Sequence, residues 1–71
     1  MTTSSAFNKL YDYHVSLDEA YHRGRRDGYH NGYYGELYGE FVPHKKYKSE
    51  EHQKMYDKGY KEGSREGWLD S

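Results

Sequence analysis

Residues 21–33 read YHRGRRDGYHNGY, and residues 56–68 read YDKGYKEGSREGW. The two stretches align at an offset of 35 residues, with one Tyr and three Gly in register. The matching positions are Tyr21, Gly24, Gly28 and Gly32 in the first stretch and Tyr56, Gly59, Gly63 and Gly67 in the second. Six of the eight glycines in the chain belong to this pattern, which indicates that one structural unit occurs twice.

Both stretches show the period of an α-helix. At roughly 100° per residue, the three glycines share one helix face with Tyr21 in the first stretch and with Tyr56 in the second. Ser16 precedes an acidic first turn with Glu19 three positions later, which is a capping-box pattern. Ser49 precedes a second acidic turn in the same way, and acidic residues are favoured there by the helix dipole.

These signals predict two helices, over residues 17–35 and 50–69. The linker between them, residues 36–48, contains the sole proline, Pro43, which disfavours helix in the residue before it. The N-terminal segment, residues 1–15, is expected to contribute a short extra helix. The whole chain is predicted to be a single small domain.

The glycine faces predict how the helices pack. Glycine inside a helix costs about 1 kcal/mol relative to alanine, so these faces must be filled in the folded state. A stripe of small residues allows a second backbone or a large ring to approach closely. We therefore expect an all-α, antiparallel two-helix hairpin with a glycine-lined interface filled by tyrosine rings. The alternative is a self-assembling module, in which the glycine faces pair between chains and form a homo-oligomer.

Composition limits the class of protein. The chain has 71 residues and no cysteine, which excludes a disulfide framework and thiolate zinc sites. It has no apolar run of the roughly 18 residues needed to span a membrane, and its polar start lacks the layout of a signal peptide. We expect a cytoplasmic protein. A net charge of -1 argues against a general nucleic-acid binder, which usually carries a basic excess.

No pattern indicates catalysis, a metal or a cofactor. The histidines at positions 14, 22 and 30 are eight residues apart, whereas chelation on a helix requires spacings of three or four. Ser64 has no candidate base close in sequence, and the glycine spacing matches neither a dinucleotide-binding loop nor a P-loop. We therefore predict a non-enzymatic protein without a metal site or a cofactor.

Two basic and aromatic clusters are the candidate partner-binding residues. Such clusters suit RNA, through phosphate contacts and base stacking, and they suit a protein interface equally well. A solvated surface balanced by neighbouring acids is the simpler interpretation. The candidates are Arg23, Arg25, Arg26, Tyr29 and Tyr33 in the first helix and Lys45, Lys46 and Tyr47 in the linker.

The chain resembles ribosome modulation factor and related short proteins of bacteria and phages. The resemblance covers roughly residues 17–69 and is carried by the glycine series of both helices, by residues 43–47 and by Trp68. It implies a compact helical hairpin. For the named family it also implies binding to the small ribosomal subunit, which shuts down translation and pairs ribosomes.

Two functional hypotheses follow. The first is a phage-encoded binding protein that modulates a host machine, such as RNA polymerase or a defence complex, in the host cytoplasm. The second is an RNA-binding, ribosome-associated inhibitor of translation like ribosome modulation factor. That family is strongly basic and this chain is near neutral, so we place a protein partner before rRNA.

Overall fold

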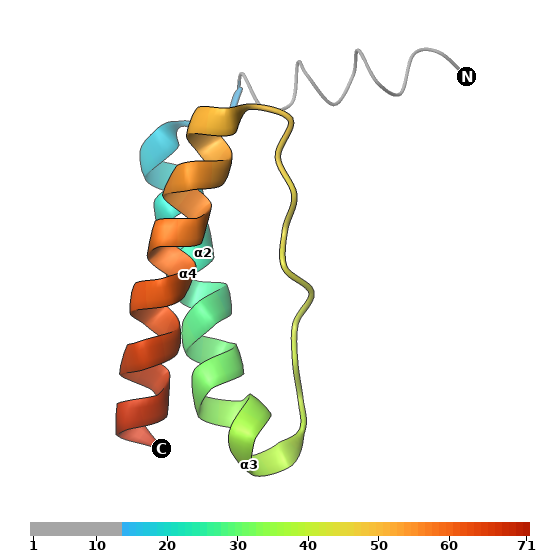
Figure 1. Cartoon of the computed structure of the whole chain (residues 1–71), viewed down its shortest axis with the longest axis vertical. Coiled ribbons are helices and arrows are strands. Elements are labelled where there is room, and N and C mark those ends of the chain that lie inside the picture. Colours follow the sequence, from blue (N-terminus) through green and yellow to red (C-terminus); the bar gives the residue numbers. More distant parts are fainter. Residues whose placement is uncertain (1–13) are drawn as a thin grey trace, which may run out of the picture.

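The computed structural model describes residues 14–71, which form two long helices beside an extended linker (Figure 1). The elements in chain order are α2 (Leu17–His30), the π-helical turn η1 (Asn31–Gly35), α3 (Glu36–Tyr38) and α4 (Glu50–Asp70). This part of the chain contains no strand, so the predicted all-α fold of two packed helices is confirmed. The short helix expected in the N-terminal segment lies outside the described residues.

Both long helices begin at the predicted serine caps. The hydroxyl of Ser16 accepts a hydrogen bond of 3.0 Å, and that of Ser49 one of 3.3 Å, each from the backbone N–H three residues later. Helical structure continues from α2 through η1 and α3 as far as Tyr38, beyond the predicted end at residue 35. It stops where Gly39 adopts a φ of 68°, a left-handed conformation that glycine takes readily.

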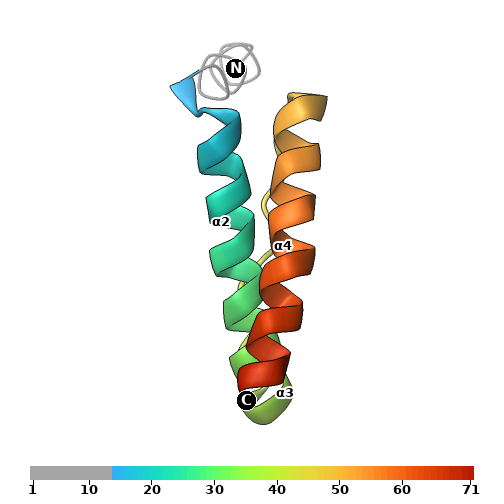
Figure 2. The same cartoon turned by 90° about the vertical axis from the view of Figure 1, so that its left-hand side faces the viewer.

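The two long helices run parallel, so the predicted antiparallel arrangement is wrong. Three contacts join residues that are 41 positions apart: Tyr21 with Glu62, Arg25 with Glu66, and Tyr29 with Asp70. Because the partner's number rises with the residue number, both helices point in the same direction (Figures 1 and 2).

The linker makes the parallel arrangement possible. Residues 39–49 run back along the helices in an extended conformation (Figure 1). An extended segment of this length can span about 36 Å, whereas the 21 residues of α4 measure about 31 Å. The chain therefore returns to the starting end of α2 before α4 begins.

Backbone atoms, and not tyrosine rings, fill the glycine faces. A Cβ atom added at Gly24 would overlap the carbonyl oxygen of Tyr56, and one added at Gly59 would overlap that of Tyr21. The other glycines of the repeat, Gly28, Gly32, Gly63 and Gly67, meet backbone atoms of the opposite helix in the same way. We call the line along which the two glycine faces meet the seam. The prediction of a glycine-lined interface is confirmed, and its filling by tyrosine is wrong because the two glycine faces meet each other directly.

The 35-residue repeat gives the helix pair an approximate two-fold symmetry. Gly24 meets residue 56 of α4, and its repeat partner Gly59 meets residue 21 of α2, so each contact occurs twice. The linker lies on only one side of the seam between the helices. We call that side the covered face and the opposite side the open face.

Candidate binding surfaces

On the covered face, two side-chain amides hold the backbone of the linker. The Asn31 amide accepts a hydrogen bond from the N–H of Val42 at 2.7 Å and donates one to its carbonyl at 3.0 Å. The Gln53 amide accepts from the N–H of Tyr47 at 2.7 Å and donates to the carbonyl of Lys45 at 3.3 Å. The linker is thus held much as a strand is held by its neighbour, through its own backbone groups.

A buried tyrosine connects the linker to both helices. The hydroxyl of Tyr56, which is 0% exposed, accepts a hydrogen bond of 3.0 Å from the backbone N–H of Lys45. It donates one of 2.7 Å to Asp27, whose exposure is 7%. Burial is the main cause that raises the pKa of Tyr56, and the neighbouring Asp27 carboxylate raises it further. The hydroxyl therefore stays protonated and serves as a structural donor.

The buried carboxylate of Asp27 also attracts two of the predicted binding residues. The Nε atom of Arg23 lies 3.5 Å from Asp27, and the Nε atom of Arg26 lies 3.7 Å from it. Both guanidinium groups remain accessible, with side-chain exposures of 44% and 71%. Part of their charge is balanced by Asp27, which lowers the positive potential that they present to a partner.

The structure brings four of the eight predicted binding residues around one cleft. Arg23 and Arg26 of α2 line it with Lys45 and Tyr47 of the linker, beside Glu19 and other residues near the start of α2. The Nζ atom of Lys45 lies 5.2 Å from the centre of the Tyr47 ring, within the range of a cation–π contact. We call this the basic cleft.

The other predicted residues lie elsewhere. Arg25 is on the open face, where its Nη2 atom lies 2.7 Å from a Glu66 oxygen, and this hydrogen bond and charge raise the pKa of Arg25. Tyr29 stacks on Tyr33 with a centroid distance of 5.9 Å. Lys46 is exposed on the linker. The predicted set is therefore divided between several surfaces.

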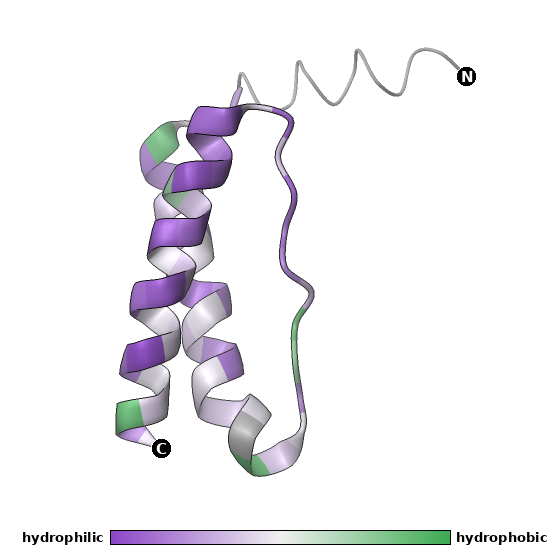
Figure 3. Ribbon diagram, viewed as in Figure 1, coloured by the Kyte–Doolittle hydropathy of each residue, from purple (hydrophilic) through white to green (hydrophobic). Residues whose placement is uncertain are grey.

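Sequence reasoning missed a group of exposed hydrophobic side chains within the described part of the chain. Six of the seven large hydrophobic side chains that are exposed among residues 14–71 belong to η1, α3, the start of the linker and the last turn of α4. These segments lie at the same end of the helix pair (Figure 1). On the ribbon coloured by hydropathy, hydrophobic positions occur at this end, on the linker and at the start of α2 (Figure 3). We call this surface the hydrophobic end, and its residues are Tyr34, Leu37, Tyr38, Phe41, Trp68 and Leu69. The sequence contained a signal for this surface. Its large hydrophobic residues occur close together within residues 34–41 and 68–69, and they do not follow the one-sided pattern of a helix that packs against a core.

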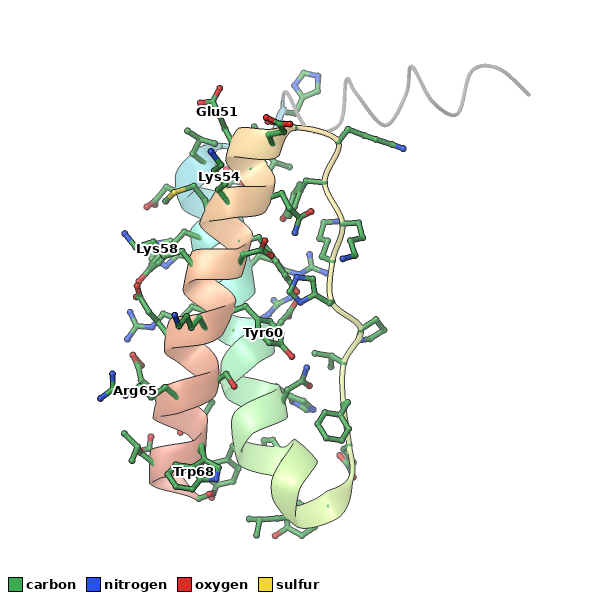
Figure 4. All side chains as sticks on the ribbon, in the orientation of Figure 1. Glu51, Lys54, Lys58, Tyr60, Arg65 and Trp68 are labelled. Atoms are coloured by element: carbon green, nitrogen blue, oxygen red, sulfur yellow. The ribbon has the colours of Figure 1, made fainter. Side chains whose placement is uncertain are left out.

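A groove opens at the hydrophobic end. The rings of Phe41 and Trp68 line it, together with the small residues Gly32 and Ser64, and its volume is about 410 Å³. Tyr60 also lines the groove, and Figure 4 shows Tyr60 and Trp68 on α4, with Trp68 near its C-terminal end. Phe41 is 67% exposed and Trp68 is 58% exposed, so both rings are available to a ligand.

Asp57 offers a direct probe of the covered face. Its pKa is lowered mainly by the hydrogen bond from Gln53, at 3.0 Å, and then by His44, at 2.9 Å. Its carboxylate therefore stabilises the fold above the unfolded-state pKa, and this contribution is lost as the pH falls through the lowered folded-state pKa.

We expect the Asp57 carboxyl to titrate, in an NMR experiment, below the usual value of about 3.9. Gln53→Ala should raise this midpoint, because the hydrogen bond from Gln53 is the largest single cause of the lowered pKa, and His44→Ala should raise it as well. An unchanged midpoint in Gln53→Ala would contradict the assignment.

Among the described residues, no group of three or more His, Asp or Glu side chains is arranged to hold a metal ion. Within residues 14–71, no helix combines the length and the apolar composition that crossing a bilayer requires. No protein-family model, curated protein or solved structure matches the chain. The resemblance to ribosome modulation factor therefore stays a prediction from the sequence.

Proposed function

We propose that this chain is a small non-enzymatic binding protein that attaches, through its hydrophobic end, to a protein component of a larger machine and modulates that machine. The single observation that carries the proposal is that six of the seven large hydrophobic side chains exposed among residues 14–71 belong to the hydrophobic end. Large exposed apolar side chains concentrated in one region of a small polar protein are typical of a protein–protein interface.

The composition of the hydrophobic end supports a protein partner. Trp and Tyr are enriched among interface residues that contribute most to binding energy. The Phe41–Trp68 groove can accept an apolar side chain, and Ser64 adds a hydroxyl to its lining. The resemblance to short phage and bacterial proteins suggests the machine: a host RNA polymerase, a ribosome or a defence complex.

The experiment is affinity capture from a host lysate by the full chain, with and without ribonuclease. We expect capture to resist the nuclease and to fall at least about tenfold in Trp68→Ala and Tyr38→Ala, since anchors of this kind contribute about 2 kcal/mol or more. Lys54→Ala, at the far end of α4, is the control and should capture normally. Unchanged capture by both aromatic variants would reject the hydrophobic end as the interface.

The basic cleft supports a second candidate function, RNA binding by a ribosome-associated factor. Arg23, Arg26 and Lys45 come together there beside the Tyr47 ring, a combination that suits phosphate contacts and base stacking. This function predicts capture of ribosomes that disappears after ribonuclease treatment. It also predicts a steep fall of affinity with salt and loss of binding in Arg26→Glu.

A further inference from the structure

The covered and open faces present equivalent groups because of the 35-residue symmetry. On the covered face, the hydroxyl of Tyr56 in α4 donates to Asp27 in α2. On the open face, the hydroxyl of Tyr21 in α2 donates to Glu62 in α4. The donor and the acceptor of each pair are 35 residues from their counterparts, so the two hydroxyls occupy equivalent places on opposite sides of the seam.

The next contact along the seam repeats as well. On the covered face, the Asn31 amide donates hydrogen bonds to the Tyr60 hydroxyl and to the carbonyl of Val42, and it accepts one from the N–H of Val42. Glu66 and Arg25 take the places of Asn31 and Tyr60 on the open face, and they lie 2.7 Å apart. An adjacent carboxylate and guanidinium supply an acceptor and several donors, the same combination that the Asn31 amide supplies to Val42.

The covered face shows what these groups bind. Tyr56 accepts the backbone N–H of linker residue 45, and Asn31 pairs with both backbone groups of residue 42. Tyr56 and Asn31 therefore contact the backbone of an extended segment at two positions that are three residues apart. On the open face, Tyr21 has the lone pairs of a hydroxyl oxygen and Glu66 has those of a carboxylate, so each can accept a backbone N–H while keeping its present contact.

Charge indicates the composition of the segment. The cross-helix contacts of the open face contain three carboxylates, Glu62, Glu66 and Asp70, and one guanidinium, Arg25. Arg25 and Glu66 expose 45% and 43% of their side chains. A segment with lysine or arginine side chains complements the carboxylates that α4 contributes, whereas Arg25, Arg26 and His22 of α2 line a separate pocket with Tyr29. The linker that occupies the covered face is itself basic, with Lys45, Lys46 and Lys48.

We infer that the open face binds an extended, basic segment of a protein partner. The segment runs along the seam as the linker does on the covered face, with backbone contacts to Tyr21 and to the Arg25–Glu66 pair. The inference rests on the proposed function only in taking the partner to be a protein. It assigns a second contact surface, separate from the hydrophobic end, so that one partner chain can be held at two places.

The test uses a fluorescent peptide with the sequence of residues 39–49, since that segment is known to fit the equivalent face. Titration of the full chain should give saturable binding. Glu66→Ala and Tyr21→Phe should each weaken it at least about fivefold, because they remove the carboxylate and the hydroxyl that accept backbone N–H groups of the segment. Lys61→Gln, exposed on α4, is the control for a general charge effect. Amide NMR shifts should move at residues 21, 25, 62 and 66.

Several results would overturn the inference. One is the lack of saturable binding up to about 1 mM, where association is too weak to be specific. Another is a set of shifts centred on Asn31 and Gln53, which would mean that the peptide displaces the linker. A third is a set of nuclear Overhauser contacts between residues 1–13 and the open face without peptide, which would identify the chain's own segment as the occupant. An RNA oligonucleotide that shifts residues 21 and 66 while the peptide does not would likewise reject it.

A substitution at the hydrophobic end distinguishes failure of this inference from failure of the proposed function. Trp68→Ala should leave peptide affinity at the open face unchanged while it reduces capture of the partner from lysate. Loss of peptide binding in Trp68→Ala would show that the peptide occupies the groove at the hydrophobic end, and the open-face site would be rejected.

Discussion

Replacing Gly63 by alanine should destabilise the protein by about 2 kcal/mol or more, although alanine is the better helix former by about 1 kcal/mol. The added Cβ atom would lie 2.8 Å from the carbonyl carbon of Arg25 and 2.9 Å from its Cα atom. These are backbone atoms of α2 that cannot rotate away, so the helices must separate. The same conflict arises at the repeat position, Gly28, against the backbone N of Ser64.

A domain of this size has roughly 3–5 kcal/mol of stability available. The double variant Gly28→Ala/Gly63→Ala is therefore expected to be unfolded at 25 °C, as measured by circular dichroism and urea denaturation. Lys61→Ala adds an alanine to the exposed side of α4 and should change stability by no more than about 0.5 kcal/mol. A rise in the unfolding temperature of Gly63→Ala would show that the helices do not touch along this seam.

Tyr56→Phe should cost about 2–4 kcal/mol, the second largest effect. The change removes the hydroxyl that accepts the N–H of Lys45 and donates to Asp27. It leaves a buried carboxylate and a backbone N–H each short of a partner, and such losses cost about 1–3 kcal/mol apiece. Urea denaturation measures the loss, and faster hydrogen exchange at the Lys45 amide should show that the linker has loosened.

The symmetry of the pair supplies a matched control. Tyr21→Phe removes the equivalent hydroxyl on the open face, where Tyr21 is only half-buried and water can replace it as the partner of Glu62. We expect a loss of at most about 1 kcal/mol. We attribute the difference in stability to the linker, which covers Tyr56 but not Tyr21. Equal losses of stability in Tyr56→Phe and Tyr21→Phe would contradict this explanation.

The candidate sites were only partly predictable. Arg23 and Arg26 are neighbours of Lys45 and Tyr47 because the linker runs back over the start of α2. No local pattern encodes that path. Arg25 looks equivalent to Arg26 in the sequence, yet a rotation of about 100° per residue places it on the open face beside Glu66. The hydrophobic end depends on both helices finishing together, which only their parallel direction brings about.

By itself, the sequence determined the two helices, their serine caps and the glycine seam between them. These features depend on local hydrogen bonding and on the angle of each residue around the helix axis, which periodicity records directly. The sequence did not determine helix direction, and the antiparallel prediction was wrong, because a glycine at every fourth position presents the same stripe to a parallel or an antiparallel neighbour. Tertiary structure alone distinguished Tyr21 from Tyr56, which the repeat makes identical: the linker covers one face of the pair, so Tyr56 is buried in the core and Tyr21 is only half-buried.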